Sequence, residues 1–417
     1  MSIGWSSKGF PALQTGHEVA RIGWNVLDGS ALVPLLTIRE SALKGKIETM
    51  AAYCRREGVE LAPHGKTTMA PEIFSMQLEA GAWGMTAATA WQVGAMRAMG
   101  CRRILLANVL VDPAGVALVA QELANDPEFE LYCYVDSVDG LRVMVEEMEK
   151  CKWPRPLPVL LELGQERGRT GMRSVAAALA LAAEIVQTHH VELAGIAGFE
   201  GLIKGDETHS VTDGVRAFLR ELRRLVEEAD RLGYFAEREE VIVSAGGSSY
   251  FDLVVDALVG LELSVPVRRI IRSGGYVTHD IKMYEDTSPL ALRRSPNEPL
   301  RLRPAMELWA TVWSRPEPEL VIAGFGKRDA GHDYGLPQPL RLHRRGTGEV
   351  HSLADDHVVT DLNDQHAFLR VPAQAEIGPG DVIVCGISHP CTSFERWRSI
   401  PLIDDDHLVI DSVETYF

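Results

Sequence analysis

The feature that most constrains this chain is an alternation of strand-like and helix-like segments that runs from about residue 59 to residue 276. The expected strands are 59–62, 83–86, 103–106, 131–135, 158–163, 193–197, 241–244 and 269–272. The expected helices between them include 71–80, 88–99, 115–125, 138–150, 175–187 and 212–233. Strands that alternate with helices predict parallel βαβ units, and eight units fit a closed (β/α)₈ barrel of the TIM type better than an open sheet.

After about residue 285 the pattern changes, because helical periodicity fades, prolines become frequent and short alternating runs appear. Short strands separated by turn signals predict a C-terminal all-β domain. The segment before Pro34 also lacks a helical period, and chain termini often lie close together, so we expect it to pack with that domain. The predicted organisation is an N-terminal segment (1–35), a barrel (36–285) and a β-strand domain (286–417).

Composition limits the class of partner. The chain has 42 Lys and Arg against 58 Asp and Glu, a net charge of −16, which argues against nucleic acid and against an anionic membrane surface. It contains no apolar run long enough to span a membrane and no secretory signal pattern at its start. Its six cysteines are scattered without a CxxC pair, which suits a reducing compartment. We therefore expect a cytoplasmic protein that acts on a small molecule.

A lysine follows the first expected strand. In a (β/α)₈ barrel the functional groups gather just beyond the carboxyl ends of the strands, and His64 and Lys66 lie at that position. A lysine amine can form a Schiff base with an aldehyde cofactor and later act as a base. Most lysines at strand ends are solvated surface charges, so the position alone leaves both interpretations open. The GxxxxG spacing of a phosphate loop is absent here.

Two glycine-rich turns follow the seventh and eighth expected strands, which are the usual positions of a phosphate cradle in such barrels. Glycines let backbone amides approach an anion, and the start of a following helix favours negative charge. Ordinary tight turns also use Gly and Ser, but two such turns at these positions favour a phosphate. The residues concerned are Ser244, Gly246, Gly247 and Ser248 in the first turn, and Arg272, Gly274 and Tyr276 in the second.

A possible metal motif, His389-Pro390-Cys391, follows a strand-like run near the C-terminus. Residues two apart on an extended chain face the same side, with Cα atoms roughly 6.6 Å apart, so an imidazole and a thiolate could bind one ion. Two protein ligands suit a catalytic metal rather than a structural one. The alternative is a proline turn with a buried thiol, and the spacing alone favours that alternative.

Three short sequence motifs together resemble those of a known family. They are the Pro-His-x-Lys-Thr string at 63–67, the Glu-Leu-Gly…Arg-Thr-Gly turn at 162–171, and Ser-His-Pro-Cys-Thr-Ser-Phe at 388–394. They resemble the fold-type III pyridoxal-phosphate enzymes, in particular the D-serine dehydratase and D-threonine aldolase branch of the alanine racemase superfamily. The resemblance runs from about residue 34 to the C-terminus. It implies an alanine-racemase-like barrel with a C-terminal β-domain, and a homodimer.

The resemblance also implies roles for individual residues. Lys66 would hold pyridoxal 5′-phosphate as a Schiff base beside His64, with Arg169 near the phenolic oxygen and Arg272 near the pyridine nitrogen. The phosphate would be held by Gly246, Gly247, Ser248, Gly274 and Tyr276, with Ser244 nearby. His389 and Cys391 would bind a divalent metal, zinc in preference to manganese. The chain departs from the family at 364–366, where the usual acidic-acidic-His is Asp-Gln-His, and at 164–168, where two extra residues leave Arg167 and Arg169 as competing candidates.

The activity implied is β-elimination from a D-3-hydroxy amino acid such as D-serine, which gives a 2-oxo acid and ammonia. Related aldolases tend to have a carboxylate where this chain has Cys391, and that difference favours the dehydratase. The first alternative is D-threonine aldolase-type cleavage by the same groups. A racemase is less favoured because no tyrosine is identified as the base on the opposite face. An alternative from another class is a non-catalytic carrier of pyridoxal phosphate, which would need neither the β-domain nor the metal motif.

Overall fold

The computed structural model describes residues 2–3, 8–10, 14–15, 23–29, 31–204, 210–290 and 300–417. The chain forms two compact units. The barrel unit consists of Met50–Lys66 and Gln77–Gly274, and the β-rich unit consists of Met1–Thr49, Thr67–Met76 and Gly275–Phe417. The chain passes from one unit to the other within α2 (Glu40–Glu57) and α3 (Pro71–Glu79). Parts of the expected barrel segment, residues 36–49 and 67–76, therefore cluster with the β-strands instead.

The barrel unit contains the eight expected parallel strands, and each begins or ends within a few residues of its predicted position. In chain order they are β4 (Glu60–Leu61), β5 (Met85–Ala87), β6 (Arg103–Val109), β7 (Glu130–Val135), β8 (Leu157–Leu163), β9 (Val191–Gly198), β10 (Val241–Ala245) and β11 (Val267–Ile271). The ladder runs β4-β11-β10-β9-β8-β7-β6-β5. A parallel bridge between His64 and Thr86 joins its two ends, so the predicted barrel closes.

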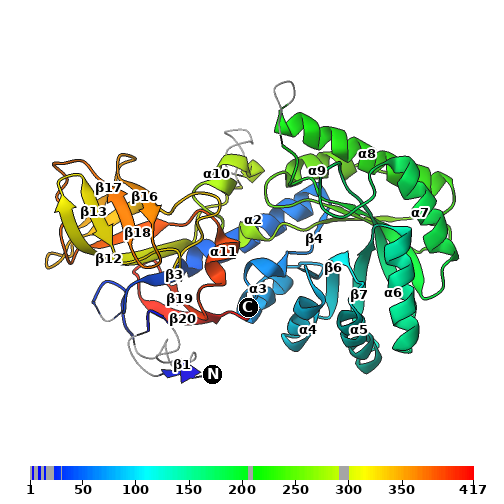
Figure 1. Cartoon of the computed structure of the whole chain (residues 1–417), viewed down its shortest axis with the longest axis horizontal. Helices are drawn as coiled ribbons and strands as arrows, with labels where there is room; N and C mark the ends of the chain where they lie inside the picture. The colour runs from blue at the N-terminus through cyan, green and yellow to red at the C-terminus, as the bar shows by residue number, and fades with distance from the viewer. Residues whose placement is uncertain are drawn as a thin grey trace. The chain divides into compact units, whose positions relative to one another are not determined.

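Helices pack around these strands, as the ribbons of α4 to α7 show in Figure 1. They are α4 (Ala90–Ala98), α5 (Pro113–Asn125), α6 (Val138–Lys150), α7 (Val175–Gln187), α8 (Val211–Arg231) and α9 (Phe251–Leu258). Side-chain oxygens cap the start of five of them, at Thr89, Asp112, Ser137, Ser174 and Ser210. These caps explain why the predicted helix starts lie within two residues of those observed.

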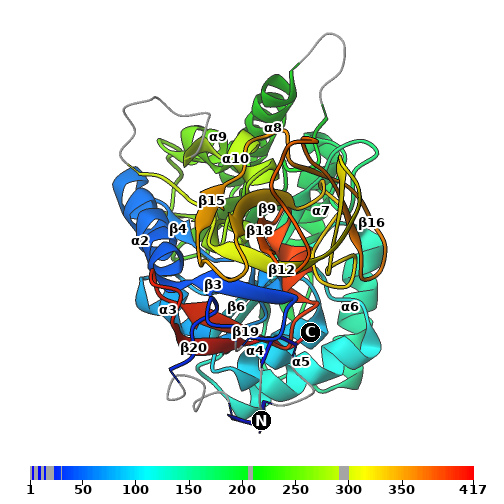
Figure 2. The ribbon, with the colours of Figure 1, turned by 90° about the vertical axis from the view of Figure 1, so that its left-hand side faces the viewer.

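The β-rich unit is built on one large sheet, ordered β15-β14-β18-β12-β13-β17-β16, with β3, β19 and β20 joined to it. Figure 2 faces this unit. Its strands are β3 (Leu35–Arg39), β12 (Met306–Glu317), β13 (Leu320–Ala323), β14 (Gln338–His343), β15 (Val350–Ser352), β16 (Val358–Leu362), β17 (Ala367–Arg370), β18 (Val382–Gly386), β19 (Ser399–Ile403) and β20 (Val409–Glu414). The short elements of the chain are β1 (Ser2–Ile3), β2 (Gln14–Thr15), η1 (Gly65–Thr67), η2 (Gly275–Val277), α10 (Met283–Thr287) and α11 (Pro390–Phe394).

Described residues near the N-terminus pack into the β-rich unit. Trp24 shares a buried cluster with Leu35, Trp309 and Val409, and Asn25 forms an antiparallel bridge with Leu408. The strand β3 begins just after Pro34, and it pairs antiparallel with β12 and parallel with β19.

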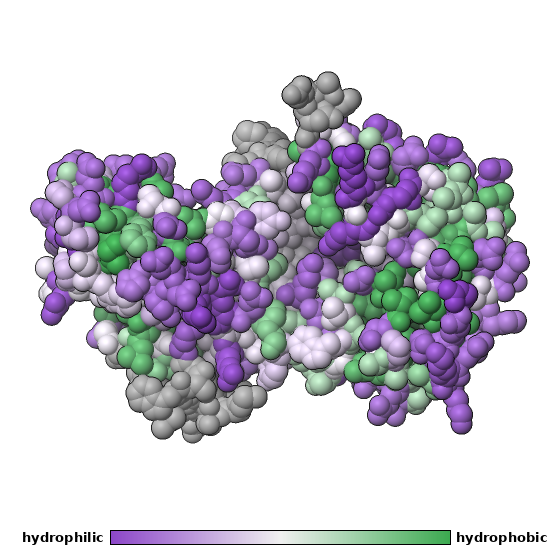
Figure 3. All heavy atoms as spheres, in the orientation of Figure 1, coloured by the Kyte–Doolittle hydropathy of each residue, from purple (hydrophilic) through white to green (hydrophobic). Residues whose placement is uncertain are grey.

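Hydrophilic side chains cover most of the face shown in Figure 3, and the apolar patches between them are small. Among the described residues, no helix is long and apolar enough to cross a membrane.

A buried lysine stands out in the β-rich unit. Lys46 on α2 is 2% exposed, and its Nζ donates a hydrogen bond of 2.5 Å to the carbonyl of Arg303. Burial lowers the pKa of Lys46 from 10.5 to about 7. The folded protein therefore disfavours the charged amine that the unfolded chain carries at neutral pH.

Replacing Lys46 with Met should raise the free energy of unfolding at pH 7 by about 2–4 kcal/mol, after allowing for the lost hydrogen bond to Arg303. In the wild type, the cost of burying the charged Lys46 amine is complete below the folded pKa of about 7, and it disappears above the unfolded pKa of 10.5. The advantage of Lys46→Met should therefore shrink when urea unfolding is repeated at pH 10. Lys44→Met, at a more exposed position of the same helix, is the control and should change little at either pH. An equal advantage of Lys46→Met at both pH values would contradict the burial argument.

Candidate active site

Lys66 lies in η1, directly after the first barrel strand, and its side chain is exposed. His64, two residues before it, has a buried Nδ1 with no hydrogen-bond partner among the described residues. Burial is the main cause that holds the pKa of His64 well below its usual range, and the positive charges of Lys66, Arg272 and Arg169 act in the same direction. His64 is therefore a neutral imidazole, and three predicted site cations act on it within the barrel unit.

Arg272 is the best-anchored of these cations, and it is 5% exposed. Its Nη1 donates to Ser244 Oγ at 2.5 Å, and its Nη2 donates to the carbonyl of Gly198 at 2.7 Å. The guanidinium also lies over the Tyr134 ring, 5.9 Å from its centroid. Ser244 in turn donates to the carbonyl of Ile270 at 2.9 Å. Ser244 thus positions Arg272, a role different from the phosphate contact expected of the turn that it begins.

The first glycine-rich turn is organised by a carboxylate. Glu200 is fully buried, and its two oxygens accept hydrogen bonds from the backbone amides of Gly246 at 3.0 Å and Gly247 at 2.9 Å. Gly246 has φ +95, a conformation that favours glycine. Because Glu200 holds both amides, a phosphate at these two positions would have to displace its carboxylate. The phosphate role of Ser248 stays a prediction.

Glu200 was visible in the sequence only as a polar residue after the sixth strand. A glycine-rich turn predicts exposed backbone amides that need a hydrogen-bond acceptor. The sequence does not show whether a ligand or a side chain of the protein supplies that acceptor.

Replacing Glu200 with Ala should lower the free energy of unfolding by about 2–4 kcal/mol, since two amides of the turn lose their acceptor. Glu221→Ala, at an exposed position of α8, is the matched control and should change stability by less than about 0.5 kcal/mol. Urea denaturation of both variants measures the difference. Equal stability of the two variants would show that the turn does not depend on Glu200.

Arg169 lies on the loop after β8. Its guanidinium stacks over the Phe199 ring at 4.6 Å, and its charge acts on His64. The loop is held by Asp136, which accepts from the Gly171 amide at 3.2 Å, and by Arg173, which donates to the carbonyl of Gly171 at 2.9 Å. Arg169 thus acts electrostatically on His64, and which of Arg167 and Arg169 serves the cofactor stays a prediction.

The second glycine-rich turn is buried. Arg272, Gly274 and Tyr276 are all buried, and η2 follows within the β-rich unit. The phosphate role of Gly274 and Tyr276 stays a prediction.

The metal motif lies where β18 gives way to α11, within the β-rich unit. His389 is extended, with φ −145 and ψ 105, and Pro390 begins the helix that contains Cys391. The motif is therefore not the continuous extended segment expected from the spacing, because proline is favoured at the first helical position. His389 and Cys391 nevertheless interact, since Cys391 is one of the groups that raise the pKa of His389. Both are only partly buried, which fits ligands of a catalytic ion.

Neighbouring side chains position both candidate ligands. His389 Nδ1 is 2.6 Å from Asp333 Oδ2, and Cys391 Sγ is 3.3 Å from Thr67 Oγ1. Thr67 is 2% exposed and follows Lys66 in the chain. Burial by itself would lower the pKa of His389, but the interactions with Cys391 and Asp333 outweigh it and raise that pKa. The sequence analysis identified neither Asp333 nor Thr67 as a partner of the motif.

A second carboxylate, Asp280, lies near the motif in the same unit. Its Oδ1 accepts from the amides of Lys282 at 2.8 Å and Tyr284 at 3.0 Å. Its buried Oδ2 has no hydrogen-bond partner among the described residues. Burial raises the pKa of Asp280 to about 6, while the charge of His389 acts in the opposite direction. In the part of the chain that the structure describes, no three His, Cys, Asp or Glu side chains form a ready metal cluster, so a metal here would rest on two protein ligands.

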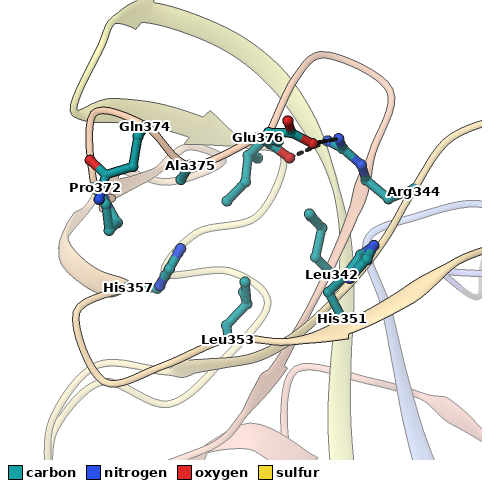
Figure 4. A pocket seen from close by; sticks show the side chains of 10 residues that line it. Leu342, Arg344, His351, Leu353, His357, Pro372, Gln374, Ala375 and Glu376 are labelled. Carbon is teal, nitrogen blue, oxygen red and sulfur yellow. Dashed lines mark hydrogen bonds and ion pairs between the residues drawn. The ribbon is translucent and has the colours of Figure 1, made fainter.

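A separate pocket of about 310 Å³ opens in the β-rich unit (Figure 4). Its walls include His351, His357 and the ion pair between Arg344 and Glu376, at 2.8 Å. It contains none of the predicted site residues.

The comparisons with known proteins agree with this architecture. The family model "Alanine racemase, N-terminal domain" matches residues 38–251, which is more than half of the chain. The chain belongs to the alanine racemase family. This family comprises the fold-type III pyridoxal-phosphate enzymes, so the predicted family and the predicted fold class are both confirmed. A second model, "Putative serine dehydratase domain", matches residues 305–403 and includes the His389-Pro390-Cys391 motif.

Members of the family resemble the chain over nearly its whole length. A D-threonine aldolase from Arthrobacter sp. is 26% identical over 399 residues, covering 95% of this chain and 93% of that one. The crystal structure of D-threonine aldolase from Filomicrobium marinum is 20% identical, with a TM-score of 0.75, and covers 94% and 97% of the two chains. D-threo-3-hydroxyaspartate dehydratase from Delftia sp. HT23 is 20% identical, with a TM-score of 0.69, and covers 92% and 97%. A cysteine-to-alanine mutant of a D-threo-3-hydroxyaspartate dehydratase matches in a metal-free form.

Proposed function

We propose that this protein is a pyridoxal-phosphate- and metal-dependent lyase that eliminates water from a D-3-hydroxy amino acid and releases a 2-oxo acid and ammonia. D-Serine is the simplest substrate of this class. The observation that carries the proposal is the pairing of His389 with Cys391 beside Thr67, the residue that follows Lys66. An imidazole and a thiolate form a soft ligand pair that suits zinc, with manganese as the alternative.

The barrel unit would hold the cofactor. Bound there, pyridoxal phosphate would supply an electron sink for the carbon from which a proton leaves. The amine of Lys66 would bind the cofactor's aldehyde and, once the substrate's amine replaces it, would take the α-proton. Arg169 and Arg272 would lie at the ring's phenolic oxygen and nitrogen, and the neutral imidazole of His64 would lie beside the ring without adding charge. Ser248, Gly274 and Tyr276 remain the proposed phosphate contacts, whereas Gly246 and Gly247 would contribute only if Glu200 moved away.

The β-rich unit would hold the metal. Hydroxide is a poor leaving group, and a divalent ion at this site would supply Lewis acidity toward the β-oxygen. His389 and Cys391 would bind the ion and leave positions open for substrate and water. The hydrogen bond to Thr67 would hold the sulfur of Cys391 in place.

Aldol cleavage of D-threonine is the second candidate, and the 26% identity to a D-threonine aldolase over nearly the full chain favours it. A non-catalytic carrier of the cofactor is less favoured, because a carrier has no use for the His389–Cys391 pair. We also propose a homodimer in the cytoplasm, on the strength of the family resemblance and of the six cysteines, all of which are free thiols.

Incubating the purified protein with D-serine, D-threonine and D-3-hydroxyaspartate should yield a 2-oxo acid and ammonia from at least one of them. A chelator should abolish the reaction, and zinc should restore it. Cys391→Ala should lower turnover by at least about 100-fold while retaining the absorbance of bound cofactor, because this residue belongs to the β-rich unit. Cys151→Ala, at a partly buried cysteine of the barrel unit, is the control and should stay active.

Aldehyde and glycine as the products would replace the dehydratase proposal with the aldolase. Cys391→Asp should shift metal preference toward manganese and increase cleavage relative to elimination, since a carboxylate is the harder ligand. If a metal-free Cys391→Ala enzyme kept full β-elimination activity, the metal role would be wrong, and His389-Pro390-Cys391 would be only a structural proline turn.

A further inference from the structure

The imidazole of His389 is fixed from several sides by residues of the β-rich unit. Its Nδ1 is 2.6 Å from Asp333 Oδ2 and 3.3 Å from Thr392 Oγ1. The Tyr334 ring meets it edge-on, with centroids 4.8 Å apart and planes at 86°. The side chain of His389 is only 13% exposed. The ring therefore has one preferred orientation before any ligand binds.

Asp333 is itself held in place. Thr392 Oγ1 donates a hydrogen bond of 2.8 Å to Asp333 Oδ1, while Oδ2 of the same carboxylate faces His389. A carboxylate can only accept, so a neutral His389 must carry its proton on Nδ1. Its Nε2 is then the unprotonated nitrogen, and this is the form in which imidazole binds a metal.

We propose that Asp333 is a positioning residue for metal binding, which fixes the tautomer and orientation of His389 so that Nε2 is presented to the ion, with Thr392 bracing the carboxylate. The inference rests on the proposed metal function and extends it to residues outside the His389-Pro390-Cys391 motif. Partners of this kind orient the first ligands of metal sites and increase their basicity.

A purely structural role for the Asp333–His389 pair makes a different prediction. The Asp333 side chain is 44% exposed, and exposed ion pairs contribute little to stability. Such a pair would therefore be expected to affect neither folding nor metal binding strongly.

The chain provides a matched comparison in the same unit. Asp356 Oδ1 is 2.7 Å from His357 Nδ1, with exposed fractions of 62% and 12% for the two side chains. His357 lines the pocket of Figure 4, and no cysteine is among the residues that line that pocket.

The test is a zinc titration of the cofactor-loaded protein after removal of metal, in competition with a zinc-binding indicator. Asp333→Ala should weaken zinc binding about 10–100-fold. Asp333→Asn should weaken it less, because the amide oxygen still accepts but carries no charge, and Thr392→Val should weaken it in the same direction. Asp356→Ala should bind zinc as the wild type does. The absorbance of bound cofactor and the thermal midpoint of the metal-free protein should stay unchanged in all of these variants.

The outcomes separate this inference from the proposed function. If the wild type binds no zinc, or if His389→Ala binds it normally, the metal function and the inference both fail. If His389→Ala loses zinc but Asp333→Ala retains wild-type affinity, only the role of Asp333 is overturned. If Asp333→Ala does not fold, Thr392→Val decides the question, and unchanged zinc affinity in that variant overturns the inference.

Discussion

The burial of Arg272 is the interaction on which the functional end of the barrel depends. A buried guanidinium must be paired with acceptors, and here the Ser244 hydroxyl and the Gly198 carbonyl supply them from two neighbouring strands. The arginine therefore links the ends of β9, β10 and β11. Its charge also contributes to keeping His64 neutral, although burial of that imidazole is the larger cause. Arg272 thus helps to align three strands and also helps to keep His64 uncharged.

The candidate metal ligands depend on a different local feature, which is the short helix that begins at Pro390 after the end of β18. Pro390 begins α11, which follows the end of β18 at Gly386 after a short connection, and this helix brings Thr392 to His389. Asp333 joins this group from a segment far away in sequence. The same turn brings Cys391 against Thr67. The contacts of Arg272 and those of the metal motif lie in different compact units of the chain.

The sequence was most informative where a local pattern decides the structure. Short strand-like runs located all eight barrel strands, and the helix-like segments between them located the helix starts to within two residues. Residues 36–49 and 67–76 were assigned to the barrel although they cluster with the β-rich unit, because periodicity shows that a helix forms but does not show which unit it packs against. In the same way, glycines predicted a turn that needs an acceptor, and the sequence could not show that the carboxylate of Glu200 supplies it.

The partners of the metal motif could not have been predicted for a related reason. Asp333 precedes His389 by a long stretch of chain that contains several strands, and only the assembled sheet brings the two together. The extended geometry expected for His389 and Cys391 was wrong because proline at the first helical position was read as part of a strand. The two side chains nevertheless interact, because a helical first turn also places such neighbours within reach of each other. Their role as metal ligands stays a prediction.

The most direct test of the account is to locate the cofactor on the chain. Reduction of the cofactor-loaded protein with borohydride, followed by digestion and mass spectrometry, should place the added cofactor mass on the peptide that contains Lys66. Attachment to any other lysine, or no covalent cofactor after reduction, would contradict the assignment of the barrel end around Lys66, His64 and Arg272 as the active site.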